Sequence, residues 1–236
     1  MKALAIGLLA LLASLPAAAA DGALTPYVAD YDVKYGRMSV GTSRTALSRD
    51  GDGWAMETST NASGLYRIIA SGTLRQRSEF TLAGDDPRPA SYLFDDGTKD
   101  TDRDVSLQFD WPATRVRGIA EDRRVDVAAV AGLQDSASMQ ALVLARLRTG
   151  REPGTIAMIE KDKVKYYRYT LLRRETLKTA IGDVETVVYR SARDGSDRET
   201  ITWHAPKLGF TAVKAEQLTA GKRGFQTYIR KYQPGN

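Results

Sequence analysis

The sequence predicts a mainly β protein, built as a single curled antiparallel sheet (a half-barrel) with one principal amphipathic helix against the concave face. Apolar and polar residues alternate with a two-residue period along most of the chain, which is the pattern of half-buried strands. Turn signals rich in Gly, Asp and Pro interrupt the alternation roughly every 8–12 residues. A sheet this long must close or curl to protect its edges.

The clearest strand pattern follows soon after the first twenty residues. Tyr27, Ala29, Tyr31, Val33 and Tyr35 fall on one face of an extended segment, and mostly charged residues occupy the other. Two Asp-Gly pairs shortly afterwards predict a hairpin turn. The strands expected in this half are 27–35, 38–47, one beginning at 54, 73–82, 90–94, 105–111, 115–120 and 123–127.

Two segments between these strands break the pattern. Residues 62–70 are expected to form a turn of helix or an irregular loop. The segment GDDPRP, residues 84–89, is expected to be a loop, because its two prolines cannot donate to a strand ladder.

One stretch, QDSASMQALVLARLRTG, predicts a helix over residues 136–148. Four apolar residues recur in it at helical spacing, Asp135 or Ser136 can cap its start, and Gly150 can end it. The four are Met139, Leu142, Val143 and Leu147. Alternation then returns, with strands expected at 155–159, 164–174, 184–191, 199–203, 210–217 and 225–232.

The first twenty residues, MKALAIGLLALLASLPAAAA, are typical of a secretory signal peptide. Lys2 supplies a positive charge, an uncharged apolar run follows it, and the alanines before residue 21 match a signal-peptidase site. We expect cleavage after Ala20, which leaves residues 21–236 as a single β-rich domain. No later stretch approaches the roughly 20 apolar residues that span a membrane. We therefore expect a soluble periplasmic protein, with no transmembrane segment in the mature chain.

The chain has no cysteine and a single histidine. A bacterial lipoprotein needs a cysteine at its cleavage site, so we do not expect a lipoprotein. The same counts argue against thiol catalysis, iron–sulfur clusters and histidine-rich metal sites. Without the leader, 33 basic and 29 acidic residues leave a net charge of +4. No basic block with interleaved aromatics indicates nucleic-acid binding, and we expect no cofactor and no metal.

Acidic residues offer candidate sites of low specificity. Asp100, Asp102 and Asp104 alternate on one face and could bind calcium, but the Gly and Glu that complete an EF-hand loop are missing. A solvated hairpin flank is the favoured interpretation. Paired carboxylates for glycoside hydrolysis cannot be identified without geometry.

The only histidine, His204, follows Trp203 in the stretch ITWHAPKLGF. A lone histidine beside an aromatic could be a catalytic base or the last residue before a turn. Alternation from Ile201 points Trp203 to the interior and His204 outward, and Pro206 then begins a turn. We therefore favour a strand-end residue over a catalytic base.

The aromatic residues could line a ligand cavity or fill an ordinary sheet core, and both interpretations stay open. One helix can cover only part of the apolar face of so large a sheet, and uncovered apolar surface usually marks a ligand or partner site. The residues expected to line a ligand groove are Tyr31, Tyr35, Trp54, Trp111, Met139, Leu142 and Trp203.

Several motifs, taken in order, resemble one family of exported bacterial proteins, that of the domain of unknown function 3108. The motifs are YDVKYGRMSVGTSRTAL, NASGLYRI, RSEF, PRPASYLF, FDW, LQDSASMQALVLARLR, TAIGDVETVVYR and WHAPKLGFTAVKAEQ. The resemblance spans almost the whole mature chain. It implies a curled sheet similar in shape to the periplasmic lipoprotein carrier, and it implies no agreed activity.

We therefore expect a non-enzymatic envelope protein that binds a lipid, lipoprotein or glycan in the groove of its sheet. Two alternatives remain open. One is an envelope glycan enzyme that uses Asp or Glu residues in the same groove, which two buried carboxylates facing each other would favour. The other is a scaffold that binds a partner protein, which an apolar patch on the outer face would favour.

Overall fold

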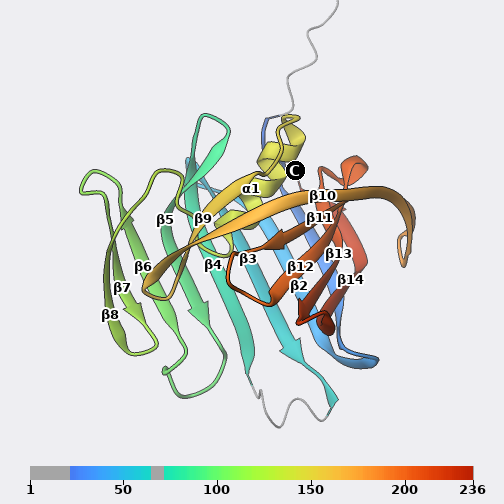
Figure 1. Ribbon diagram of the computed structural model, residues 1–236, viewed down its shortest axis with the longest axis horizontal. Helices are drawn as coiled ribbons and strands as arrows, with labels where there is room; N and C mark the ends of the chain where they lie inside the picture. The colour runs from blue at the N-terminus through green and yellow to red at the C-terminus, as the bar shows by residue number, and fades with distance from the viewer. Residues whose placement is uncertain (1–21, 65–71, 236) are drawn as a thin grey trace, which may run out of the picture.

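The computed structural model describes residues 22–64 and 72–235, which form one antiparallel sheet of 14 strands and one α-helix (Figure 1). The expected leader and most of the segment 62–70 lie outside the described residues. The strands are β1 Tyr27–Tyr35, β2 Met38–Asp50, β3 Gly53–Ala62, β4 Thr73–Ala83, β5 Asp86–Asp95, β6 Val105–Asp110, β7 Arg115–Ala120, β8 Arg123–Ala128, β9 Thr155–Glu160, β10 Lys163–Thr179, β11 Gly182–Ala192, β12 Arg198–Ala205, β13 Thr211–Thr219 and β14 Lys222–Pro234. The helix α1 is Ser138–Arg148, and a short 3-10 helix, η2, is Pro206–Leu208.

The sheet places its first and last strands at the centre. The order is β8-β7-β6-β5-β4-β3-β2-β1-β14-β13-β12-β11-β10-β9, so β8 and β9 are its two edges. α1 lies in the chain between these edge strands, and the sheet is not closed into a barrel. A mainly β fold with a single antiparallel sheet and one helix is therefore confirmed.

Two-residue alternation located the strands because one face of most of them is buried. In β1, Tyr27, Ala29, Tyr31 and Val33 are buried, and the residues between them are only half-buried. Each segment that alternates in the sequence forms a strand, although several strands extend a few residues further than the pattern does. These extensions lie at the hairpin ends, where side chains reach solvent and the pattern fades.

β5 shows that the loop expected at residues 84–89 was wrong, because this strand includes Pro87 and Pro89. β4 pairs along the whole of β5, but β6 pairs only with its later residues, so the prolines lie where one side of β5 lacks a strand neighbour. Side chains take the place of that neighbour. Trp111 Nε1 donates to the Pro89 carbonyl at 2.6 Å, and Gln134 Nε2 donates to the Pro87 carbonyl at 2.9 Å.

α1 is buried on more sides than the predicted amphipathic helix would be. It contacts β4 and β5, while Leu142, Val143 and Leu147 pack against Ile156 of β9 and Val187 of β11. Seven of its 11 residues are buried. Strands from both halves of the curled sheet surround the helix, so little of its surface is left for solvent.

Asp135 caps the turn that leads into α1. Its Oδ1 accepts hydrogen bonds from the backbone N–H groups of Ala137 and Ser138, both at 2.9 Å. Its Oδ2 accepts one from Ser78 Oγ of β4 at 2.6 Å. The carboxylate therefore starts the helix and ties that start to the sheet.

Gln134 connects the edge strand β9 to β5 in the other half of the sheet. Its backbone N–H donates to the Ala157 carbonyl at 2.9 Å, and its carbonyl accepts from the Ile159 N–H at 2.8 Å. Its side-chain Nε2 donates to Pro87 of β5 and, at 3.1 Å, to the Gly132 carbonyl. One fully buried residue thus joins the two halves of the sheet.

Replacing Gln134 with Met is expected to lower the free energy of unfolding by about 1–3 kcal/mol, because the Pro87 carbonyl loses its donor inside the protein. Gln140→Met makes the same change at an exposed position of α1 and should cost less than about 0.5 kcal/mol. Urea unfolding of both variants and the parent measures the difference. Equal stability of the two variants would contradict the role assigned to Gln134.

Candidate functional site

The inner face of the curled sheet and α1 enclose a cavity of about 690 Å³. Its lining comes from β1 to β4, from β9 to β14 and from the region around the start of α1. Small-molecule sites commonly measure roughly 300–1,000 Å³. This cavity is therefore the main candidate site in the described part of the chain.

Hydroxyl and amide side chains dominate the cavity wall. Twelve of the 29 lining residues are Ser, Thr or Gln, and four more are Tyr. Some of them bond to one another: Thr45 Oγ1 lies 3.0 Å from Thr58 Oγ1, and Ser136 Oγ donates to Gln76 Oε1 at 2.9 Å. The twelve residues are Ser43, Thr45, Thr58, Gln76, Ser136, Gln140, Ser191, Ser196, Thr200, Thr202, Gln217 and Thr227.

Apolar residues from α1, β3 and β9 also line the cavity, and they are called the apolar strip. The strip consists of Met56, Met139, Val143, Leu144 and Met158. Methionine side chains adapt their shape to different apolar groups. The cavity can therefore accept a molecule that is mainly polar but carries some apolar surface.

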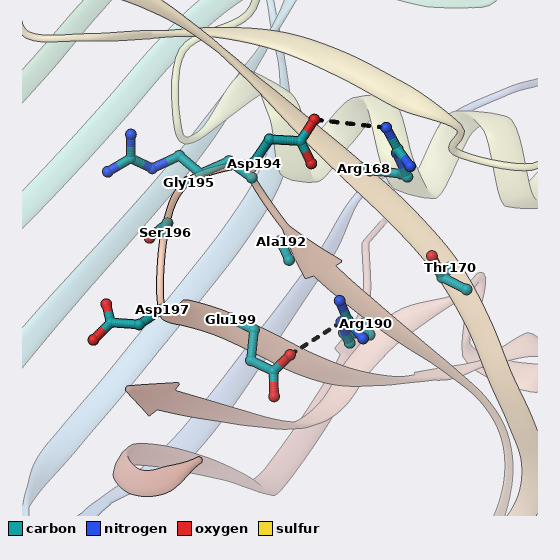
Figure 2. A pocket seen from close by; sticks show the side chains of 10 residues that line it. Arg168, Thr170, Arg190, Ala192, Asp194, Gly195, Ser196, Asp197 and Glu199 are labelled. Atoms are coloured by element: carbon teal, nitrogen blue, oxygen red, sulfur yellow. Dashed lines mark ion pairs between the residues drawn. The ribbon is translucent and has the colours of Figure 1, made fainter. Parts of the chain in front are cut away.

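Charged residues gather at the β11–β12 turn, where Figure 2 shows a smaller hollow of about 290 Å³. This hollow shares four of its lining residues with the cavity. Its charges are partly paired, Arg168 with Asp194 at 3.7 Å and Arg190 with Glu199 at 3.0 Å. The turn therefore forms a charged rim beside the cavity.

His204 lines the cavity, which corrects the expectation that it points outward. The residue is 6% exposed. Its Nδ1 lies 2.9 Å from the Phe210 carbonyl, so Nδ1 carries the proton of the neutral ring, and Nε2 is buried without a hydrogen-bond partner in the described chain. Burial lowers the pKa of His204 to about 4, although the bond to Phe210 partly opposes this shift. At neutral pH, Nε2 is thus a free acceptor.

Trp203 is buried as expected, but on the opposite face of β12 from His204. Alternate residues of β12 that include His204 line the cavity, and Trp203 does not. Its Nε1 donates to Glu175 of β10 at 2.5 Å, and Lys214 Nζ lies 4.1 Å from its ring centre. Trp203 also belongs to the main hydrophobic cluster, together with Val188 and Val213, so apolar neighbours and long charged side chains both keep its ring from solvent on this face.

The structure separates the seven residues predicted to line a groove. Tyr31 and Met139 line the cavity. Leu142 packs in the apolar cluster between α1, β9 and β11, and Trp54 is buried in the main core with the Arg49 guanidinium 4.0 Å from its ring centre. These four residues come from the inner side of the molecule, but only two of them reach the cavity.

The other three predicted residues lie apart from the cavity. Trp111 follows β6 at the β6–β7 turn and stacks on Phe109 with ring centres 5.9 Å apart. Tyr35 lies at the exposed end of β1, and Trp203 lies on the outer face. Whether any of the seven contacts a ligand stays a prediction.

Sequence reasoning missed the polar residues that make up most of the wall. Tyr167 and Tyr169 of β10 line the cavity, as do Thr200 and Thr202 of β12. In β12 the polar residues were placed on the solvent side by alternation. A signal was nevertheless present, because Ser, Thr, Gln and Tyr recur on one face of several neighbouring strands instead of Lys, Glu and Asp.

Three carboxylates meet at the β5–β6 connection, where one oxygen each of Asp95, Asp96 and Asp104 lies within 4.8 Å of the others. Only Asp104 belongs to the three aspartates considered for calcium from the sequence. Hydrogen bonds from Thr98 lower the pKa of Asp96, and Arg103 lies 3.5 Å from it. These contacts account for the cluster as part of a polar loop.

One family model, described as Protein of unknown function (DUF3108), matches residues 30–224 of the chain. The chain belongs to the DUF3108 family. No curated protein shows a significant sequence match to this DUF3108 member. No helix in the described ranges is long and apolar enough to cross a membrane.

Two solved structures align with this DUF3108 chain at low identity. One, from Parabacteroides distasonis and described provisionally as a lipoprotein, has a TM-score of 0.38 and 8% identity over 90% of this chain and 97% of that chain. The other, from Bacteroides fragilis and described provisionally as an exported protein with a YmcC-like fold, has a TM-score of 0.36 and 7% identity over 89% and 96%. At these TM-scores neither likeness supports a conclusion about this chain.

His204→Asn should remove an acid-sensitive group while keeping a donor for the Phe210 carbonyl. The pKa of His204 is about 4 when folded and 6.5 as its ordinary value, so its neutral form supports the fold above pH 6.5 and loses that effect as the pH falls towards 4. Between pH 7 and pH 4 the parent should lose on the order of 2–3 kcal/mol relative to the variant. Urea unfolding across this range measures it, and parallel curves would contradict the burial of a neutral ring.

Asp135→Asn should show the opposite pH dependence. Burial raises the pKa of Asp135 from 3.8 to about 6, and the hydrogen bonds from Ser78, Ser138 and Ala137 oppose that shift only in part. The stabilising effect of the protonated form is present below pH 3.8 and is lost as the pH rises through 6. From pH 4 to pH 7 the parent should lose on the order of 2–3 kcal/mol relative to Asp135→Asn in the same unfolding measurements. A variant whose pH profile matches that of the parent would contradict this assignment.

Proposed function

We propose that this protein is a non-enzymatic binding protein of the bacterial envelope and that its cavity holds a glycan. The observation that carries the proposal is the hydroxyl and amide wall of the cavity. The leader-like first twenty residues support a periplasmic location, and the lack of cysteine supports a protein without a lipid anchor.

A glycan suits this wall better than an acyl chain does. A buried hydroxyl or amide left without a hydrogen-bond partner costs about 1–3 kcal/mol, and hydrocarbon offers no partner. Thr200 and Gln217 face each other across β12 and β13, so one sugar would meet donors and acceptors from two strands. His204 adds an acceptor that no group of the described chain uses.

The same cavity also has places for the apolar faces of sugar rings. Tyr167 and Tyr169 offer aromatic rings with polar tips, and the apolar strip beside α1 lies within the same cavity. A ligand with hydroxyl groups and C–H faces would use both kinds of wall.

Binding without turnover is favoured over glycan hydrolysis by what the cavity acids contact. Hydrolysis needs two carboxyl groups on either side of the scissile bond. Glu160 accepts a hydrogen bond from Tyr167, and Glu199 pairs with Arg190 at 3.0 Å. Two of the three acids that line the cavity are therefore engaged by neighbours, and the third, Asp197, lies in the β11–β12 turn at the rim.

A double variant, Thr200→Val with Thr202→Val, tests the proposal while conserving side-chain shape. It should weaken binding of oligosaccharides released from the envelope of the source bacterium about tenfold, because two hydrogen bonds worth about 0.5–1.5 kcal/mol each are lost. Thr81→Val, at an exposed position of β4, is the matched control and should bind like the parent. Isothermal titration calorimetry measures all three proteins.

Native mass spectrometry of protein purified from the envelope distinguishes the other outcomes. A retained acyl lipid, with no oligosaccharide binding in the titration, would replace the glycan with a lipid ligand. Shortened oligosaccharides after incubation with the protein would show that it is an enzyme. An empty cavity with no binding of either class would overturn the proposal.

A further inference from the structure

Three exposed apolar side chains form one row across the ends of β14, β1 and β2. Phe225 pairs with Tyr35, and Tyr35 pairs with Met38, so the three are direct cross-strand neighbours. They are 51%, 46% and 57% exposed. The rings of Tyr35 and Phe225 meet edge to face with centres 5.1 Å apart. The three side chains therefore form a continuous apolar edge beside the β1–β2 and β13–β14 turns, which lie at the lower right of Figure 1.

This apolar row lies next to the lining of the cavity. Two residues further along β1 and β14, Val33 pairs with Thr227, and Thr227 lines the cavity. Residues two apart in a strand share a face. The row thus continues the inner face of the sheet beyond the cavity, at the same end as the charged rim of the β11–β12 turn.

Basic side chains flank the row in both turns. Arg37 lies in the β1–β2 turn, and Lys222 and Arg223 follow the β13–β14 turn; all three are exposed. Glu216 of β13, close to this turn, is buried and paired with Lys214 at 2.7 Å and with Arg223 at 3.4 Å. The exposed charge beside the apolar row is therefore positive.

The charged residues of the neighbouring β11–β12 turn do not make this end of the molecule negative. Its acids are Asp194, Asp197 and Glu199, and its own basic residues are Arg193 and Arg198. Asp194 and Glu199 also form ion pairs with arginines of β10 and β11.

We propose that this end of the molecule docks on the surface of an anionic phospholipid bilayer. Tyr35, Met38 and Phe225 would enter the interface between headgroups and acyl chains, where exposed aromatic and apolar side chains are stabilised. The flanking Arg37 and Lys222 would bind headgroup phosphates. Docking in this orientation turns the end of the cavity at Thr227 towards the membrane.

Other exposed large apolar residues do not combine these features and provide a matched control. Leu93 and Ile119 are 49% and 57% exposed on β5 and β7, and both neighbour Ser106 of β6. They match the row in exposure but lie on strands far from it in the sheet order. A double substitution there removes as much apolar surface without touching the proposed docking edge.

The first experiment is flotation of the processed protein with vesicles of equimolar phosphatidylglycerol and phosphatidylcholine. The parent should float with these vesicles and much less with pure phosphatidylcholine. Tyr35→Ser with Phe225→Ser should lower vesicle binding about tenfold or more. Leu93→Ser with Ile119→Ser should leave it unchanged, and a thermal melt of each variant verifies folding.

The second experiment removes charge from the docking edge. Arg37→Gln with Lys222→Gln should reduce binding to the phosphatidylglycerol vesicles about 30-fold, since each basic residue near an anionic surface contributes about fivefold. Lys178→Gln with Lys207→Gln makes the same change in charge at the opposite end of the strands and should leave vesicle binding nearly unchanged. High salt should reduce the binding of the parent in the same direction.

The proposal is overturned if the parent does not float with phosphatidylglycerol vesicles, or if either control pair loses as much binding as its test pair. It is also overturned if the two vesicle types bind equally. Oligosaccharide titration of the Tyr35→Ser, Phe225→Ser variant separates the two proposals. Glycan binding should be retained there, because neither residue lines the cavity.

Discussion

The hydrogen bond from the Gln134 side chain to the Pro87 carbonyl joins the two halves of the sheet, and the cavity between them depends on it. A sheet with fourteen strands whose end strands, β8 and β9, do not pair with each other could open without a crosslink. Gln134 pairs with β9 through its backbone and bonds to β5 through its side-chain amide, and Asp135 beside it binds Ser78 of β4. Two adjacent buried residues therefore hold α1 and β9 at a defined distance from β4 and β5.

The interior that results contains apolar, hydrogen-bonding and titratable groups side by side. Polar side chains can face this cavity at low cost, because they bond to one another or to whatever fills it. The outer face of β12 shows the reverse arrangement, since Trp203 is buried there under Lys214 and beside Glu175. In this half of the sheet, the hydrophobicity of a residue therefore does not show whether its side chain lies on the inner or the outer face.

This mixture of polar and apolar residues on both faces of the sheet explains which features could be predicted from the sequence. Strands were found because alternation needs only two different faces, whichever of them is inside. The faces of Trp203 and His204 were assigned wrongly, because alternation took the apolar residue to face the inside. The prolines of β5 led to the wrong expectation of a loop for another reason. Where β5 lacks a neighbouring strand, the side chains of Gln134 and Trp111, which are distant in sequence, donate hydrogen bonds to the proline carbonyls. Contacts of this kind leave no local pattern.

The pairing of β1 with β14 has a consequence for when the protein can fold. It brings Tyr27 beside Pro234, nearly the full length of the described chain apart. Because this pair lies in the middle of the sheet, the two halves cannot be joined until the last strand is available. High contact order makes such folding slow. A chain made in one compartment and used in another would benefit, since the delay keeps it extended and able to pass through a translocation channel before its sheet forms.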